Sequence, residues 1–107
     1  MFRHVVMWKF DDEHTPGQLR ENAIKIKAGL EELAYEVHGL VSIDVHIDPV
    51  RGGNSDADVM LDSCFENRDA FHAYLEHPRH KAVEKLIDAC AEESLCMDFE
   101  DEEDDRI

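Results

Sequence analysis

The first ten residues alternate in a way that suits a strand with apolar side chains on both faces. In an extended chain, Val5 and Met7 lie on one face. The other face carries the even-numbered positions His4, Val6, Trp8 and Phe10. A strand that is apolar on both faces is usually covered on both. Residues 2–10 are therefore predicted to form such a strand.

A long amphipathic helix is predicted after this strand. Thr15 and Gln18 have the spacing of a capping box, and Pro16 occupies the position of a first helical residue. Gly39 is expected to end the helix, since glycine readily takes the backbone conformation that follows a helix. Between these signals, apolar residues recur in steps of four and three and make one narrow stripe: Leu19, Ala23, Ile26, Leu30, Leu33 and Val37.

Two further strands and a loop come next. Residues 40–50 alternate between polar positions and an apolar face that ends before Pro49: Val41, Ile43, Val45 and Ile47. Residues 57–65 alternate in the same way, and a glycine-containing loop separates the two segments. A single loop between consecutive strands favours an antiparallel hairpin.

The last third of the chain predicts two helices and a short strand. Asn67 can cap a helix whose buried side is marked by Ala70, Phe71, Tyr74 and Leu75. Pro78 disfavours helical geometry at His77, so the helix ends there and a new one begins at the proline. Residues 94–99 are expected to form the final strand. The inward side of the second helix is predicted to carry Ala82, Val83, Leu86, Ile87 and Cys90.

The order strand–helix–strand–strand–helix–strand is that of the ferredoxin-like fold, an α+β arrangement. Its helices would cover one face of a four-stranded antiparallel sheet. Counting strand faces by parity places the Val41–Ile47 stripe beside Val5 and Met7 on the opposite face. A large exposed apolar patch usually marks an interface. We therefore expect a homodimer in which two sheets pack face to face.

The net charge of −15 narrows the range of partners. The last ten residues contain seven acids and one arginine, and the remaining body is acidic as well. Phosphate binding needs clustered lysine and arginine, so nucleic acid and anionic membranes are poor partners. We expect one domain over residues 1–99 and a disordered acidic tail over 100–107. The start does not resemble a signal peptide and no apolar run approaches ~20 residues, so we expect a cytoplasmic location.

The three cysteines lack the spacing of a disulfide framework or of a zinc site. Cys64, Cys90 and Cys96 include no CxxC pair, and we expect them to be reduced thiols in the core. His77 and His80 are compatible in spacing with a metal pair, but no third ligand has a clear motif. The sequence therefore predicts no metal and no cofactor.

The segment AYLEHPRHKAV, residues 73–83, combines the groups that acid–base chemistry needs. His80 falls in the first turn of the helix that begins at Pro78, where the helix dipole disfavours an imidazolium. Burial acts in the same direction, so a neutral ring could accept a proton near pH 7. Tyr74 could donate a hydrogen bond to a carbonyl oxygen that gains charge. His4 could reach the same pocket from the first strand.

Each of these residues also has a structural interpretation. His77 is well placed as the N-cap of the second helix, and His80 can instead face solvent in its first turn. Tyr74 can be a core residue with its hydroxyl at the surface. His4 can be a core histidine whose hydrogen bonds are satisfied within the protein. The sequence alone leaves both interpretations open.

Two stretches resemble the stress-responsive α/β-barrel (Dabb) family. FRHVVMWKF is similar to that family's apolar first strand, which carries a histidine and ends in Lys-Phe. DVMLDSCFENRDAFHAYLEHPRHKAV is similar to its second signature, a strand ending in Phe, a short helix with an aromatic residue, and His-Pro-x-His. The resemblance extends from Phe2 to Phe99 and implies a dimeric α+β barrel.

The resemblance also implies an activity. Some plant members are polyketide cyclases, which perform an intramolecular aldol-type condensation without metal or organic cofactor, using a tyrosine and a histidine. Tyr74 and His80 match these two residues, and His4 matches a first-strand histidine that supports the pocket. Val59 stands where the plant cyclases have another histidine, so the polar side of this pocket differs.

We therefore predict lyase or cyclase-like chemistry on a small carbonyl compound, with three catalytic residues, His80, Tyr74 and His4. The expected ligand-binding residues are Trp8, Val59, Phe71 and His77. Two other functions remain open. Cofactor-independent monooxygenases use a similar dimeric barrel, and a non-enzymatic dimer could bind a small hydrophobic ligand or contribute to stress tolerance.

Overall fold

The computed structural model describes residues 1–101 of the chain. Within this range the predicted order of elements is confirmed, with the second crossover split into two helices at Pro78. The elements are β1 (Phe2–Phe10), α1 (Pro16–Glu31), η1 (Glu32–Tyr35), β2 (Leu40–His46), β3 (Val59–Phe65), α2 (Arg68–Glu76), α3 (Pro78–Cys90) and β4 (Ala91–Glu100).

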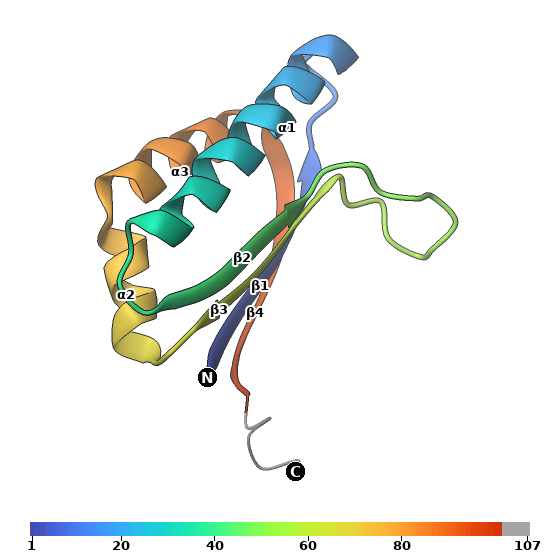
Figure 1. The fold of residues 1–107 in the computed structure, drawn as a ribbon. Helices are drawn as coiled ribbons and strands as arrows, with labels where there is room; N and C mark the ends of the chain where they lie inside the picture. Colours follow the sequence, from blue (N-terminus) through green and yellow to red (C-terminus); the bar gives the residue numbers. More distant parts are fainter. Residues whose placement is uncertain (102–107) are drawn as a thin grey trace.

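The strands form one antiparallel sheet in the order β2-β3-β1-β4. β1 therefore lies inside the sheet, between β3 and β4. The helices lie on one side of the sheet and leave its other face uncovered, and the loop between β2 and β3 extends beyond the ends of the strands (Figure 1). The predicted ferredoxin-like α+β fold with a four-stranded antiparallel sheet is confirmed.

Local capping signals begin the helices as predicted. The Thr15 hydroxyl accepts a hydrogen bond from the Gln18 backbone at 3.2 Å, and the Gln18 side chain accepts one from the Thr15 backbone at 2.9 Å. Asn67 caps α2 by accepting a hydrogen bond from the backbone N–H of Ala70 at 2.9 Å. The first helix ends earlier than predicted, at Glu31, and the chain continues as the tighter helix η1.

The hydrophobic core lies between the helices and the covered face of the sheet. Strand register assigns the faces, because residues that pair directly share a face. His4 pairs with Ser63, and Ser63 pairs with Ile43, so these three side chains point toward the helices. The largest completely buried apolar side chains come from both layers: Ile26, Leu30, Leu33, Val45, Leu61 and Phe65.

The predicted position of the Val41–Ile47 stripe on the open face is wrong. Ile43 and Val45 are buried under the helices, with 7% and 1% of their surface exposed, whereas Val41 is 51% exposed. The β2–β3 register shifts at the start of β2, which interrupts the simple alternation there. An alternating pattern marks one buried face of a strand, but it does not say which face of the sheet that is.

The open face is nevertheless apolar, because β4, and not β2, contributes exposed apolar side chains to it. The register pairs Val5 with Met97 and Met7 with Leu95. Leu95, Met97 and Phe99 are 74%, 67% and 41% exposed. On the neighbouring strand β3, Met60 pairs with Met7 and lies on the same face. We call this surface the apolar sheet face, and its members are Val5, Met7, Met60, Leu95, Met97 and Phe99.

The third and fourth strands differ from the predicted ones at their ends. β3 begins at Val59, later than predicted, and β4 is longer than residues 94–99. Its additional residues pair with β1, and the backbone N–H of Asp101 donates to the carbonyl of Met1 at 2.7 Å. The rest of the tail that was predicted to be disordered, residues 102–107, lies outside the described residues.

Two side chains that were predicted to be buried are exposed. Ala82 on α3 lies at the surface, and so does Cys96 on β4, while Cys64 and Cys90 are buried and form no disulfide, as predicted. Cys96 is exposed because β4 lies at the edge of the sheet, where side chains are open to solvent. In residues 1–101, no helix is long and apolar enough to cross a membrane.

Candidate functional site

A cavity of about 270 Å³ lies between the sheet and the helices. Its apolar wall consists of Val6, Trp8, Leu30, Leu61, Leu75 and Ile87. Its polar wall consists of His4, Tyr74, His80, Glu84, Asp88, Ser94 and Cys96. The cavity thus brings together the three predicted catalytic residues, which come from β1, α2 and α3.

The break at Pro78 positions His80 beside Tyr74. His77 has an extended backbone with a ψ of 132°, so α2 ends there and α3 starts in a new direction. The Nδ1 atom of His77 accepts a hydrogen bond from the backbone N–H of Arg79 at 3.1 Å, which caps α3. The rings of Tyr74 and His80 consequently meet with their centroids 4.5 Å apart and their planes at 57°.

Two polar atoms of this pair are buried without a hydrogen-bond partner, the Tyr74 hydroxyl and Nδ1 of His80. Tyr74 is 0% exposed and His80 is 9% exposed. Buried polar groups are normally paired, because an unpaired one costs about 1–3 kcal/mol. Each atom therefore lacks a protein partner, and a polar ligand that reached it would supply the missing hydrogen bond.

Burial also sets the ionisation of both groups. Desolvation raises the pKa of the Tyr74 hydroxyl well above its usual value, and the Glu84 carboxylate acts in the same direction. Desolvation lowers the pKa of His80, with a further contribution from His4, while Glu84 opposes the shift. Near neutral pH, Tyr74 is thus a hydrogen-bond donor and His80 is an uncharged ring that can accept a proton.

His4 is held by a residue that sequence analysis missed. Its Nδ1 atom lies 2.5 Å from Oδ1 of Asp98 on β4. Its ring contacts Phe71 at 4.8 Å between centroids, and Tyr74 at 6.3 Å. The Sγ atom of Cys96 lies 3.7 Å from the same Nδ1. Only the pairing of β1 with β4 brings Asp98 and Cys96 to His4, so no local sequence signal identifies them.

Of the four predicted ligand-binding residues, Trp8 is among those that line this cavity. Phe71 packs against the β1 histidine without lining the cavity. His77 caps α3, and its Nε2 atom lies 3.9 Å from the Glu36 carboxylate. Val59 is buried on β3 and lines a different hollow beside the β2–β3 loop. A role in ligand binding stays a prediction for all four residues.

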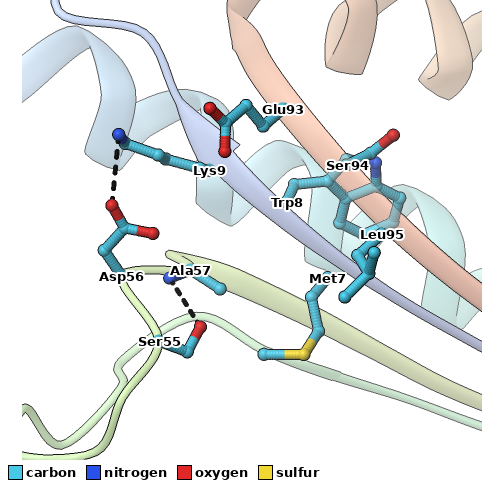
Figure 2. A pocket seen from close by; sticks show the side chains of 9 residues that line it. All are labelled: Met7, Trp8, Lys9, Ser55, Asp56, Ala57, Glu93, Ser94 and Leu95. Atoms are coloured by element: carbon cyan, nitrogen blue, oxygen red, sulfur yellow. Dashed lines mark hydrogen bonds and ion pairs between the residues drawn. The ribbon is translucent and has the colours of Figure 1, made fainter.

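A further hollow lies where the β2–β3 loop meets the ends of β1 and β4, as Figure 2 shows. The ammonium group of Lys9 reaches the Asp56 carboxylate at 3.1 Å. Met7 and Leu95 lie side by side on paired strands and belong to the apolar sheet face (Figure 2). The residues that line this hollow include neither histidine nor tyrosine. It therefore continues the apolar surface and lacks the acid–base groups of the cavity.

We expect the free energy of unfolding to fall as the pH is lowered from 7 to 5, partly through His80. Burial places the pKa of His80 in the folded protein below the value of about 6.5 that applies in the unfolded chain. As the pH falls through that value, the unfolded chain takes up a proton before the folded protein does, so stability is lost. Above a pH of about 6.5, the contribution of the neutral His80 ring to the free energy of unfolding is fully present. Urea denaturation should show a smaller loss for His80→Gln.

The matched control is His38→Gln, because His38 is exposed. This variant should keep the pH dependence of the wild type. Glu84, His4 and His77 act on the ionisation of His80 and are present in every variant. If stability of His80→Gln falls as steeply with pH as that of the wild type, the assignment of His80 as a buried neutral group is wrong.

Solved structures with the same fold come from several bacteria. A dimeric protein of unknown function from Bacteroides fragilis is 25% identical, with a TM-score of 0.85 over 94% of this chain and 95% of that one. A Dabb family protein from Mesorhizobium loti is 19% identical, with a TM-score of 0.70 over 94% and 95% of the two chains. A Nitrosomonas europaea protein, provisionally described as an antibiotic biosynthesis monooxygenase, is 11% identical, with a TM-score of 0.73 over 95% and 99%. At such low identities, the last two likenesses show the fold alone.

Sequence comparison places the chain in a family. A search of curated proteins found no match. Residues 2–101, however, match the family described as "Stress responsive A/B Barrel Domain", or Dabb. The match spans β1 with its histidine, the β3 strand, and the His-Pro-x-His segment at the start of α3. The family resemblance seen in the sequence is thereby confirmed, and this chain is a member of the Dabb stress-responsive A/B barrel domain family.

Proposed function

We propose that this protein binds a small carbonyl compound in the cavity and removes a proton from the carbon next to the carbonyl group. The observation that carries the proposal is the pair of unpartnered polar atoms, the Tyr74 hydroxyl and Nδ1 of His80. One is a donor and the other is an acceptor, and both belong to residues that line a cavity with an apolar wall. A carbonyl compound offers the matching groups, an acceptor oxygen and an acidic C–H bond.

The proposed step uses these two residues in different roles. His80 accepts the proton as the C–H bond breaks, and the electron pair of that bond moves toward the carbonyl oxygen. Tyr74 donates a hydrogen bond to this oxygen, which stabilises the enolate as it gains charge. The resulting carbon nucleophile can then add to a second carbonyl group of the same molecule, which is a cyclase-like outcome. The step needs no oxidant and no organic cofactor.

The test is exchange of α-protons for deuterium in a panel of aryl and alkyl methyl ketones in D₂O, followed by proton NMR. We expect wild-type protein to accelerate exchange of at least one ketone. His80→Gln should reduce the enzymatic rate by roughly 10²-fold or more, as expected for loss of a general base. Tyr74→Phe should reduce it by about 10²-fold, through loss of an oxyanion donor.

Two matched variants separate chemistry from folding. Tyr35→Phe removes a hydroxyl that is 90% exposed, and His72→Gln changes an exposed histidine on α2, so both should exchange like the wild type. The free energy of unfolding of Tyr74→Phe should equal that of the wild type or exceed it by up to about 1 kcal/mol, because the change removes an unpaired buried hydroxyl. Undiminished exchange in His80→Gln and Tyr74→Phe would refute the assignment, and ketone binding without exchange would favour a ligand-binding protein.

We further propose that two copies of the chain associate through the apolar sheet face. This surface carries three exposed apolar side chains from β4, Leu95, Met97 and Phe99. Contiguous exposed apolar surface usually marks an interface, and no helix of the described residues covers this side (Figure 1). Related ferredoxin-like proteins from Bacteroides fragilis and Thermobifida fusca are described as dimeric, which supports the same assembly here.

A further inference from the structure

A second group of side chains, two of which line the cavity, has the composition of a metal site. His4 on β1 pairs with Asp98 on β4, and Cys96 lies two residues before Asp98 on the same face of that strand. The three ligand atoms lie within 4.8 Å of one another. We propose that His4, Cys96 and Asp98 bind a Zn²⁺ ion, at a site separate from the Tyr74–His80 pair.

The distances between the ligand atoms suit tetrahedral zinc with one small adjustment. Zinc–nitrogen and zinc–sulfur bonds of ~2.0 and ~2.3 Å give tetrahedral ligand separations of roughly 3.3–3.6 Å. The Sγ atom of Cys96 lies 3.7 Å from Nδ1 of His4 and 3.4 Å from Oδ1 of Asp98. The His4–Asp98 pair, at 2.5 Å, has to open. The Asp98 side chain is 39% exposed and has room to turn.

The donor atoms select the class of cation. Imidazole nitrogen, thiolate sulfur and carboxylate oxygen together suit borderline ions such as Zn²⁺, whereas Mg²⁺ and Ca²⁺ prefer sites made of oxygen alone. Three protein ligands also leave the fourth tetrahedral position open, as in zinc sites that bind water or substrate. A thiolate and a carboxylate carry two negative charges, which the ion neutralises.

A separate observation is a buried polar atom on the wall of the cavity beside this cluster. His80 on α3 lines the same cavity and is only 9% exposed. Its Nδ1 atom has no hydrogen-bond partner among the described residues. It also interacts electrostatically with His4. An ion on His4 would therefore lie beside a cavity whose wall carries this unpaired buried nitrogen. Any ligand bound there can contact the ion and His80 together.

The thiol requires the ion to displace a proton. A cysteine thiol has an ordinary pKa of about 8.5, so most of it carries a proton at neutral pH. Zn²⁺ deprotonates a coordinating thiol outright. One S–H bond breaks as one Zn–S bond forms, and the proton passes to the buffer.

Cobalt substitution provides the direct test. Full-length protein freed of metal is titrated with Co²⁺ and with Zn²⁺, in excess Mg²⁺ to occupy sites made of carboxylates alone. We expect one ion per chain, visible absorption typical of tetrahedral Co²⁺, and a thiolate-to-cobalt charge-transfer band. Cys96→Ser should abolish that band and weaken Zn²⁺ binding by at least roughly tenfold, and Asp98→Asn should weaken it similarly. Asp44→Asn, at an exposed position on β2, is the matched control. It should change neither the charge-transfer band nor the affinity for Zn²⁺.

The possible results separate this site from the proposed catalytic pair. A Co²⁺ spectrum without a thiolate band, or equal Zn²⁺ affinity in Cys96→Ser and wild type, would overturn the proposal. If Cys96→Ser does not fold, the spectrum of wild-type protein decides alone. Tyr74→Phe removes no ligand and should bind Zn²⁺ like the wild type. Loss of ketone exchange with intact zinc binding, or the reverse, therefore tells the two sites apart.

Discussion

Gly39→Ala is expected to lower the free energy of unfolding by about 2–4 kcal/mol, combining backbone strain with overpacking. Gly39 has a φ of +88°, a conformation that residues with a side chain rarely adopt. A Cβ atom added there would lie 2.6 Å from Cβ of Ala70, well inside van der Waals contact. The residue joins the helical layer to β2, and its carbonyl accepts a hydrogen bond from Glu66 at 2.8 Å. The contact can relax only if α2 moves, and the strain only if the backbone of residue 39 changes conformation.

Urea denaturation of three variants separates the two causes. Gly17→Ala is the matched control, because Gly17 lies in the first turn of α1 with open space around it. That change should leave stability equal or raise it by up to about 1 kcal/mol, since alanine favours helix. Adding Ala70→Gly to Gly39→Ala removes the steric contact and leaves only the strain. If Gly39→Ala proves as stable as Gly17→Ala, Gly39 does not have the conformation and the close contact with α2 described above.

Met97→Asp is expected to convert the proposed dimer into a monomer. Met97 lies in the apolar sheet face opposite Val5 and is 67% exposed in the single chain. A twofold interface would bury the residue in both copies, so a single substitution places two carboxylates in apolar surroundings. We expect the dissociation constant to rise by about 100-fold or more, because the few residues that dominate an interface lie near its centre and contribute at least about 2 kcal/mol each.

Sedimentation equilibrium over a range of protein concentrations measures this change, and circular dichroism checks that the variant is folded. Ile24→Asp is the matched control, because Ile24 is 50% exposed on α1, on the helical side of the molecule. It should dimerise like the wild type. The proposed dimer would be wrong if the wild-type protein were monomeric at high concentration. The proposed interface would be wrong if Met97→Asp self-associated as strongly as the wild type.

The parts of the fold that could be predicted from sequence depend on neighbouring residues. The Thr15 capping box, the Asn67 cap and the break before Pro78 each involve groups within a few positions of one another. The break is also what brings Tyr74 and His80 together, so the centre of the candidate site was readable from one short segment. Their meeting in a cavity with His4 needed only the correct order of strands and helices.

The parts that could not be predicted depend on contacts between distant segments. The alternation of Ile43 and Val45 identified a buried face, but only the strand register shows that this face meets the helices. Asp98 and Cys96 were missed for the same reason, since their position beside His4 follows from the pairing of β1 with β4. Nothing in their local sequence distinguishes them from other residues of an acidic strand.

The position of β1 inside the sheet has a consequence for how the protein folds. Both of its neighbours, β3 and β4, come much later in the chain. The contact between His4 and Asp98 joins residues 94 positions apart. Such distant pairings close large loops before they bring any stabilisation, which slows folding compared with helical proteins of similar size. A partly folded chain in which β4 has not yet docked would have Tyr74 and His80 in place, while His4 still lacked its partner strand. The two halves of the cavity wall would thus form at different times, and the wall carrying Ser94 and Cys96 would be the later one.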